Sequence, residues 1–353
     1  TIPIEKGLLF RARHEKNNPE GRSVLRNAYR CYDNQTEVLT KRGWKLFREV
    51  SETDEVATLS PNPGLLVYQK PQKLYVYDYE GQLFHQTGRF IDLCVTPNHN
   101  IWFRPREGAE YRFAEASQLP RRAVFNQGAI WIGTERQSFE FMPLPIYQRF
   151  RNSQTKRLKE IRPAHVVDMD DWLRFLGIYL AEGSSYRGQS GNHPAQVGIS
   201  QKNSKNIETI CEWAKRLGWR FCITKGKSSN ASRILVSQLQ LYNELAPLGH
   251  AHQKFVPDYV KELSPRQIQI FLDAFHMGDG SRVGNGTRVY YTASKQLADD
   301  LSELILKAGR AALIRRQEQE TSFGKGIWVV SEHVKTEAGV NSRNRDARHW
   351  MDY

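Results

Sequence analysis

Two similar stretches of sequence decide how the second half of the chain folds. Phe175–Ser184 reads FLGIYLAEGS, and Leu272–Ser281 reads LDAFHMGDGS. Each predicts an apolar helix that ends in an acidic residue and a glycine. A strand, an amphipathic helix and another strand are expected after each: Gln196–Ser200, Ser204–Leu217 and Arg220–Thr224, then Arg288–Thr292, Lys295–Ala308 and Ala311–Arg315. The internal repeat predicts a pseudo-twofold α/β domain.

The repeated helices can also support chemistry. Small residues four positions apart share one helix face and let two helices approach closely; they are Gly177 with Ala181 and Ala274 with Gly278. Glu182 and Asp279 follow directly and would meet where the helices cross. Two carboxylates at two helix C-termini favour a cation, and Mg²⁺ suits a water-accessible oxygen site. One copy alone would be read as an ordinary packed helix with an acid at its edge, whereas two matching copies favour a site.

Both segments resemble the paired motifs of single-chain LAGLIDADG homing endonucleases, and the resemblance covers roughly residues 165–335. It implies an αββαββα-type fold in each half, β-ribbons in the major groove of double-stranded DNA, and a monomer. It makes Glu182 and Asp279 the catalytic, metal-binding acids, with Mg²⁺ as cofactor and Mn²⁺ as the alternative. Glu182 replaces the commoner Asp of the first motif, and Ala274 stands where the first helix has Gly177.

Other residues of this half are expected to contact DNA. Lys254, in Gln253–Pro257 (QKFVP), resembles the basic residue of endonucleases inside inteins. It could stabilise a pentacovalent phosphorane or poise the attacking water; the alternative is a solvated lysine before a helix. The strand residues expected to bind DNA are Gln201, Lys202, Arg233, Arg288, Arg315 and Arg316.

Composition agrees with a polyanionic partner. The chain has 51 Lys and Arg against 38 Asp and Glu, a formal net charge of +13. Nucleic acid is the commonest partner of such a chain, although an inert basic surface is the alternative. A length of 353 residues predicts two or three domains. No apolar run reaches membrane-spanning length, which excludes an integral membrane protein and predicts no membrane partner.

The first half predicts a compact all-β region between Cys31 and about Arg104. Short β-type runs are expected at 37–39, 55–59, 65–68, 74–79, 82–86, 90–96 and 101–103. A thiol such as Cys31 can attack the preceding carbonyl, with His99 as general acid and the hydroxyl of Thr96 fixing the geometry. Taken alone, one Cys and one His would be read as a buried thiol and a surface imidazole.

The order of these residues resembles the N-terminal splicing blocks of inteins. Cys31 opens the run Thr36–Thr40, and Val95–His99 is similar to their Thr-x-x-His block. The resemblance implies the horseshoe-like all-β Hint fold shared with hedgehog autoprocessing domains, with Cys31 as nucleophile and Thr96 and His99 as activators. Large inteins carry an endonuclease inserted in this domain, so the two resemblances support each other.

The tail lacks the closing Asn of inteins, and no closing strand is expected; Asn341 followed by Ser342 is the nearest candidate. The last splicing strands are therefore expected beyond Tyr353, supplied in cis or in trans. Residues 1–30 would be an N-extein in cis, and Asn17–Arg30 resembles a segment of tailed-phage portal proteins. That resemblance implies a phage or prophage gene expressed in a bacterial cytoplasm. A start at Thr1 rather than Met predicts an excerpt of a longer precursor.

The expected organisation is therefore multidomain: a Hint-type β domain plus a LAGLIDADG-type α/β domain. Its boundaries are 1–30 for the N-extein, 31–104 for the splicing half, 105–165 for a basic linker with accessory DNA contacts, 166–340 for the endonuclease (repeats at about 170–250 and 265–335) and 341–353 for an incomplete return. The four cysteines show no disulfide pattern, which favours a reduced, intracellular setting. Two alternatives remain: a DNA-binding module whose nuclease has decayed, and a splicing element with an inert inserted domain.

Overall fold

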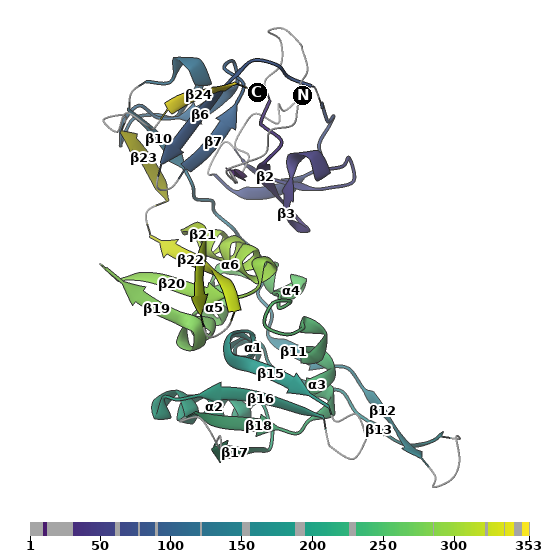
Figure 1. Ribbon diagram of the computed structural model, residues 1–353. Helices are drawn as coiled ribbons and strands as arrows, with labels where there is room; N and C mark the ends of the chain where they lie inside the picture. The colour runs from purple at the N-terminus through teal and green to yellow at the C-terminus, as the bar shows by residue number, and fades with distance from the viewer. Residues whose placement is uncertain are drawn as a thin grey trace. The chain divides into compact units, whose positions relative to one another are not determined.

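The computed structural model describes most of the chain, and the described part divides into two compact units. The described residues are 10–12, 31–60, 64–76, 78–88, 91–120, 122–149, 156–187, 195–225, 231–284, 286–321, 324–334, 336–341 and 348–352. Unit 1 comprises Thr1–Ile132, Ile305–Leu313 and His333–Tyr353, and unit 2 comprises Gly133–Leu304 and Ile314–Glu332. The protein is a mixed α/β multidomain chain with many small antiparallel sheets (Figure 1).

Unit 1 consists mainly of short antiparallel strands. They are β1 (Phe10–Ala12), β2 (Thr36–Thr40), β3 (Gly43–Leu46), β4 (Val56–Leu59), β5 (Leu66–Gln69), β6 (Gln82–Gly88), β7 (Ile91–Val95), β8 (Asn100–Phe103), β9 (Arg112–Glu115), β10 (Arg122–Asn126), β23 (Glu337–Asn341) and β24 (Arg348–Asp352), with the 3-10 turns η1 (Phe47–Glu49) and η2 (Ala116–Gln118). Leu93, Val95 and Phe103 lie at the centre of one apolar cluster. The strand expected at 74–79 does not form: the described residues of that stretch are irregular.

Two expectations about the ends of unit 1 were wrong. The tail does supply strands, because β23 pairs with β10 and β24 pairs with β6, both antiparallel. Residues 105–165 are not a separate linker, since β9, η2 and β10 belong to unit 1 and the following strands belong to unit 2. Of the expected N-extein, only β1 lies within the described residues, and it pairs with β2.

Unit 2 contains the repeat. Its elements, some of which extend into unit 1, are β11 (Ser138–Phe141), β12 (Leu144–Arg149), β13 (Lys156–Arg162), β14 (His165–Asp168), α1 (Met169–Glu182), β15 (Gly183–Tyr186), β16 (Gln196–Gln201), α2 (Ser204–Arg216), β17 (Phe221–Lys225), β18 (Ser232–Val236), α3 (Leu239–Leu245), η3 (Ala246–Leu248), α4 (Asp258–Lys261), α5 (Pro265–Asp279), β19 (Gly280–Val283), β20 (Thr287–Thr292), α6 (Lys295–Lys307), β21 (Ala311–Thr321) and β22 (Gly324–His333). Within the described residues, no helix is both long and apolar enough to cross a membrane.

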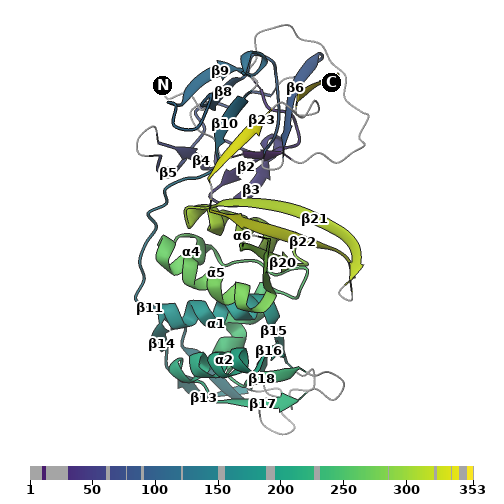
Figure 2. The ribbon, with the colours of Figure 1, turned by 90° about the vertical axis from the view of Figure 1, so that its left-hand side faces the viewer.

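The two halves of unit 2 share one topology, as the repeat predicts. The first sheet has the strand order β15-β16-β18-β17, and the second has the equivalent order β19-β20-β22-β21. Each half begins with a buried helix, α1 or α5, and the two helices lie side by side (Figure 2). Both helices start at a side-chain cap: Asp168 accepts from the backbone N–H of Asp171, and Ser264 accepts from that of Gln267. This shared frame determines where the helix C-termini lie.

Candidate active site

Glycine allows α1 and α5 to pack almost backbone to backbone. A Cβ on Gly177 would lie 2.6 Å from the carbonyl oxygen of Phe271 and 2.9 Å from Cβ of Ala274. A Cβ on Gly278 would lie 2.7 Å from Cβ of Ala181. The small residues expected at the crossing therefore form it, and where one helix has glycine the other presents alanine. Ala274 in place of glycine is accommodated because Gly177 faces it.

The helices are parallel and in register, which brings the two acids to the same end. Asp170 of α1 bonds Gln267 of α5, 97 positions later in the chain. The contacts of Gly177 with Ala274 and of Ala181 with Gly278 have the same offset, and Asp279 follows Glu182 by that offset too. Both carboxylates are therefore the last residues of adjacent helices. Residues at equivalent positions in the two copies of the repeat therefore lie next to each other in the structure.

A glycine after each acid lets the chain pass directly from helix to strand. A Cβ on Gly183 would lie 2.2 Å from the ring of Tyr179, and one on Gly280 would lie 2.4 Å from the ring of His276. Both glycines have extended backbone conformations, so space rather than backbone strain requires them. The strands β15 and β19 thus begin immediately and were missed from sequence, because GSSY and GSRV lack a β-type pattern.

The two carboxyl groups have an unusual electrostatic environment for acids. Burial, reinforced by the charge of Glu182, raises the pKa of Asp279 to about 7. Burial also raises the pKa of Glu182, while Lys254 and Lys202 oppose that rise. Both acids are half-buried rather than sealed. A desolvated pair of carboxyls that resists double ionisation is a place where a cation would be stabilised.

Lys254 lies against this pair, but its ammonium is already engaged. The side chain is buried, 5% exposed, so it is not a solvated lysine. Its Nζ donates to the carbonyl oxygens of Tyr179 and Leu180, each at 3.0 Å, and of Gly183 at 2.9 Å. Burial lowers its pKa to about 8, although Asp279 and Glu182 oppose the shift. Lys254 therefore caps the C-terminus of α1, a role that sequence did not indicate.

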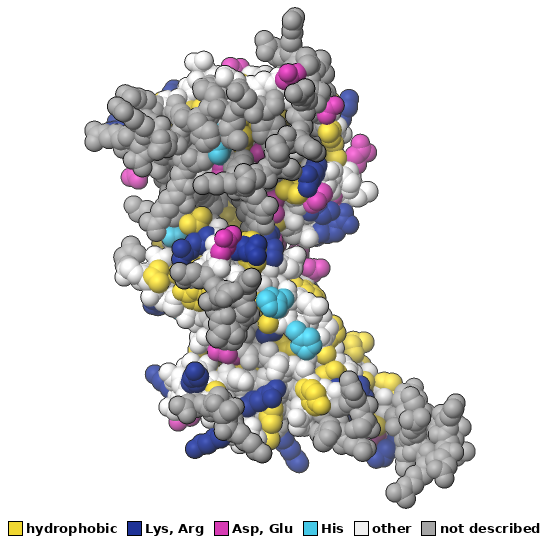
Figure 3. Space-filling model, in the orientation of Figure 1, with side chains coloured by type: hydrophobic (Ala, Val, Ile, Leu, Met, Phe, Trp, Pro, Cys, Tyr) yellow, Lys and Arg dark blue, Asp and Glu magenta, His cyan; other side chains and the backbone are white. Residues whose placement is uncertain are grey.

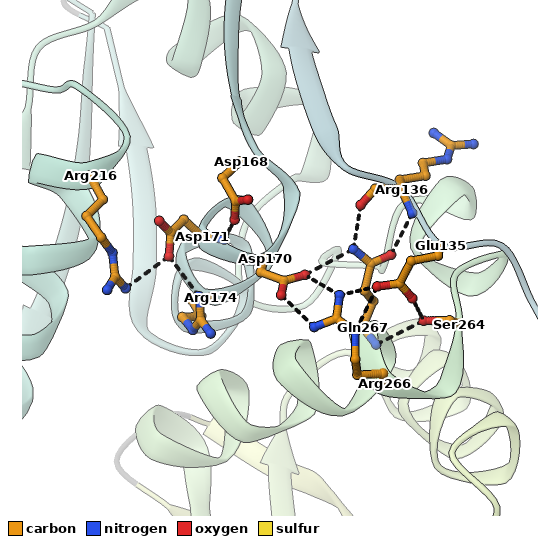
Figure 4. Close-up of polar contacts among 10 residues, drawn as sticks. All are labelled: Glu135, Arg136, Asp168, Asp170, Asp171, Arg174, Arg216, Ser264, Arg266 and Gln267. Atoms are coloured by element: carbon orange, nitrogen blue, oxygen red, sulfur yellow. Dashed lines mark hydrogen bonds and ion pairs between the residues drawn. The ribbon is translucent and has the colours of Figure 1, made fainter.

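The opposite end of the helix pair is held by a charged cluster (Figure 4). Arg266 of α5 donates to Asp170 of α1 at 2.6 and 2.9 Å, and it also pairs with Glu135. Gln267 Nε2 bonds Asp170 and the carbonyl of Arg136. The side chain of Arg266 is more than half exposed, so these ion pairs contribute modestly to stability. This cluster was not predicted from the sequence.

The six residues expected to contact DNA divide into two groups. Lys202, Arg233, Arg315 and Arg316 are exposed, and Lys and Arg side chains lie over the part of unit 2 that holds β16–β18 (Figure 3). Arg233 crosses Gly198 and donates to the hydroxyl of Ser184 at 2.9 Å. Gln201 is buried, and its side-chain oxygen accepts from the N–H groups of Lys202 and Asn203 before α2.

Arg288, also expected to contact DNA, is largely buried against α5. It donates to the carboxylate of Asp273 at 2.6 Å and to the carbonyl of Leu272 at 3.2 Å, both on α5. The pairing register explains the difference, because Arg288 and Tyr290 share the face of β20 that packs on the helix.

The three residues singled out in unit 1 come together. The backbone N–H of Cys31 donates to the hydroxyl of Thr96 at 3.0 Å, and the N–H of Thr96 donates back to the carbonyl of Cys31 at 3.0 Å. The N–H of His99 bonds the carbonyl of Thr96, and its ring contacts Tyr32 with centroids 4.4 Å apart. Burial raises the pKa of the Cys31 thiol. Arg30, whose carbonyl this thiol would attack, lies outside the described residues.

The donor set at the ends of α1 and α5 suits a divalent cation in part. The described residues contain no group of three or more His, Cys, Asp and Glu side chains that could hold a metal. Two carboxylates remain, which is what Mg²⁺ commonly takes from a protein when water and a phosphate supply its other ligands. The raised pKa of Asp279 is consistent with this, because burial and the charge of Glu182 outweigh the opposing charge of Lys254.

Comparison with known proteins found relatives that are much longer than this chain. No family model matches. The chain is 30% identical over 330 residues to an ATP-dependent Clp protease proteolytic subunit of Chlamydomonas moewusii, and 29% identical over 357 residues to a DNA-directed RNA polymerase subunit beta C-terminal section of Stigeoclonium helveticum. These matches cover 90% and 85% of this chain. The chain spans about a third of each relative, 32% and 31%.

The similar solved structures are homing endonucleases. I-DmoI in complex with DNA and Mn is 14% identical, with a TM-score of 0.37, and the match covers 47% of this chain and 90% of that one. The homing endonuclease I-WcaI bound to its DNA recognition sequence is 14% identical, with a TM-score of 0.33, over 46% of this chain and 76% of that one. The chain thus resembles homing endonucleases over about half of its length.

Proposed function

We propose that unit 2 is a site-specific, metal-dependent endonuclease of double-stranded DNA, of the two-motif LAGLIDADG type. One observation carries this proposal: Glu182 and Asp279 end two parallel helices that glycine holds in close contact. The basic surface and the exposed Lys202 and Arg233 support a polyanionic substrate. The active form is proposed to be a monomer, because one chain supplies both acids.

Glu182 and Asp279 would hold the divalent cation, Mg²⁺ by preference and Mn²⁺ as its substitute. When bound, such a cation activates water and stabilises the leaving oxygen of a phosphodiester. Lys254 keeps the C-terminus of α1 in place and offsets part of the negative charge there. The helix contact fixes the separation of the two acids. Lys202, directly after β16, and Arg233, in β18, are proposed to bind phosphates of the DNA.

The endonuclease is tested by cleavage of plasmid libraries that contain the uninterrupted host sequence. With Mg²⁺ the wild type is expected to cut at one site and leave short 3′ overhangs. Glu182→Gln and Asp279→Asn are expected to lose cleavage while an electrophoretic shift shows retained DNA binding. Glu208→Gln, an exposed acid on α2, is the matched control and should cut normally. Binding without cleavage by the wild type would instead identify a decayed DNA-binding module.

A second function, autoprocessing in unit 1, is favoured by the contact of Cys31 with Thr96. We infer that unit 1 is the larger part of a Hint-type splicing domain around an inserted endonuclease. The thiol sulfur of Cys31 would attack the carbonyl carbon of Arg30, forming a C–S bond as the C–N bond breaks. The thiol proton ends on the released amine of Cys31. Thr96 accepts from that nitrogen at 3.0 Å, and His99 is proposed as the proton donor.

The names of the relatives agree with an inserted element. A third relative, a DNA polymerase II large subunit of Thermococcus kodakarensis, is 28% identical over 42% of this chain. Its name indicates no relation to the protease subunit or to the RNA polymerase subunit. This chain matches only a minor part of each relative, as expected for a segment that is inserted in different host proteins. Residues 1–30 would then be the N-extein of a phage- or prophage-encoded host protein similar to a portal protein, made in a bacterial cytoplasm. The final splicing residues would be supplied in cis or in trans.

Autoprocessing is tested by thiol- or hydroxylamine-induced release of residues 1–30, followed by mass spectrometry. We expect release from the wild type and from Cys222→Ala, a control at an exposed thiol, but none from Cys31→Ala. Equal release rates from wild type and Cys31→Ala would remove Cys31 from this role. An uncut library together with normal release would leave unit 2 as an inert insertion.

A further inference from the structure

The segment that carries Lys254 is anchored from behind by α6. The hydroxyl of Ser294, directly before α6, donates to the backbone carbonyl of Lys254 at 2.6 Å. The carboxylate of Asp300, one turn into α6, accepts from the backbone N–H of Val256 at 2.8 Å. Residues on both sides of Phe255 are thus fixed to one rigid helix, and the lysine side chain points from there to α1.

Asp300 is itself held in place by buried partners. Lys261 Nζ lies 2.8 Å from its Oδ1, and Gln296 Nε2 donates to the same oxygen at 2.9 Å. Asp300 and Ser294 are each 1% exposed, and Lys261 is 5% exposed. A buried carboxylate is costly unless it is paired and hydrogen-bonded. Three donors on one side chain therefore indicate an orientation that is tightly specified rather than incidental.

We propose that Ser294 and Asp300 are positioning residues that hold residues 254–256 so that Lys254 caps α1 and fixes Glu182. Neither touches the site; both act through Lys254. The chain of contacts runs from α6 to the segment, from Lys254 Nζ to the carbonyls of Tyr179, Leu180 and Gly183, and from there to the intervening Glu182. The functional meaning of the arrangement rests on the proposed endonuclease, whereas the anchoring itself does not.

The anchoring serves one acid more than the other. The last turn of α5 receives a neutral donor, Asn206 Nδ2, at the carbonyl of Met277. The last turn of α1 receives the ammonium of Lys254. Loss of the anchor should therefore loosen the backbone that ends at Glu182, whereas the backbone before Asp279 keeps its contact with Asn206. The ends of α1 and α5 have the same backbone arrangement, but an ammonium group contacts one and an amide group contacts the other.

The anchoring is tested first without DNA or metal, by acetylating the full chain and following each lysine by mass spectrometry. Lys254 is expected to be protected in the wild type. Ser294→Ala and Asp300→Ala should raise the acetylation rate of Lys254 about fivefold or more, the effect expected for the loss of one hydrogen bond. Ser294→Thr keeps the hydroxyl and should restore protection. Ser302→Ala, at a buried serine of α6 whose hydroxyl donates to the carbonyl of Asp299 in the same helix, should leave Lys254 protected.

The positioning role is tested next by single-turnover cleavage of the target DNA. Ser294→Ala is expected to lower the cleavage rate at saturating protein about tenfold, with the DNA dissociation constant unchanged, and Ser294→Thr should restore the rate. Protection of Lys254 equal to wild type in folded Ser294→Ala, judged by thermal melting, overturns the anchoring. Exposure of Lys254 without a loss of rate overturns the positioning role. Absence of cleavage by the wild type would instead reject the proposed function while leaving the acetylation result valid.

Discussion

The crossing of α1 and α5 permits a quantitative test with single methyl groups. In Gly177→Ala the new Cβ would lie 2.6 Å from a backbone oxygen and 3.1 Å from the backbone nitrogen of Phe275. Backbone atoms cannot swing away, so the helices must separate by about 0.8 Å to reach an ordinary contact. Overpacking of this kind costs roughly 1–3 kcal/mol, and the better helix propensity of alanine offsets about 1 kcal/mol.

The expected net loss for Gly177→Ala is therefore between about 0 and 2 kcal/mol. For a unit of this size the upper end of that range corresponds to a fall of roughly 4–8 °C in melting temperature. The three atoms nearest to the new Cβ in Gly278→Ala belong to side chains, those of Ala181, Ile178 and Glu182. It should cost less, and Ala181→Gly should rescue it. Both are measured by thermal unfolding followed by circular dichroism.

The comparison between the two glycines gives the refutation. A melting temperature for Gly177→Ala clearly above that of the wild type would show that the helices do not pack at this distance. A larger loss in Gly278→Ala than in Gly177→Ala would also contradict the geometry. Ala274→Gly cannot fully rescue Gly177→Ala, because the contact with the carbonyl oxygen of Phe271 remains.

Three further predictions concern charge. The folded state raises the pKa of Asp279 from 3.8 to about 7, so it binds this proton more tightly than the unfolded chain does, and the stability that the proton contributes is lost as pH rises from about 4 to 7. Without divalent cations, the melting temperature of the wild type should therefore fall relative to that of Asp279→Asn as pH rises across that window. Equal pH dependence of the two melting temperatures would contradict the raised pKa. Lys202→Ala and Arg233→Ala should each lower the slope of log affinity against log salt by about 1, whereas Arg288→Ala should lower the melting temperature and leave that slope unchanged; filter binding at several salt concentrations decides this. Arg266→Ala should cost only about 1 kcal/mol or less, because its ion pairs are exposed, and a much larger loss in denaturant unfolding would show that the cluster is essential.

Much of unit 2 could be predicted because its information is local. Helices ending in an acid and a glycine, with small residues four positions apart, indicate both the elements and their contact. The amphipathic helices α2 and α6 also follow from spacing alone. Repetition then doubled the signal, since two copies must place equivalent residues in equivalent positions.

The remaining features depend on contacts distant in sequence. The ammonium of Lys254 donates to carbonyls that lie more than seventy positions earlier in the chain. A local sequence pattern carries no information about such a contact. The face taken by Arg288 depends on strand register, and a shift of one residue reverses it. The strands β23 and β24 follow a long interruption and lack a clear alternating pattern, so their return to unit 1 was not expected.

The return of β23 and β24 has a consequence for synthesis on the ribosome. Unit 1 needs strands from both ends of the chain, because β24 pairs with β6 and β23 with β10. Nearly all of unit 2 is made in between, as one almost continuous segment. Pairing of distant segments is slow, and domains fold as units during translation. Unit 2 can therefore fold before β23 and β24 have been synthesised and have paired with unit 1. Polypeptide released early would thus carry a folded unit 2 beside a β-sheet of unit 1 that lacks its last strands.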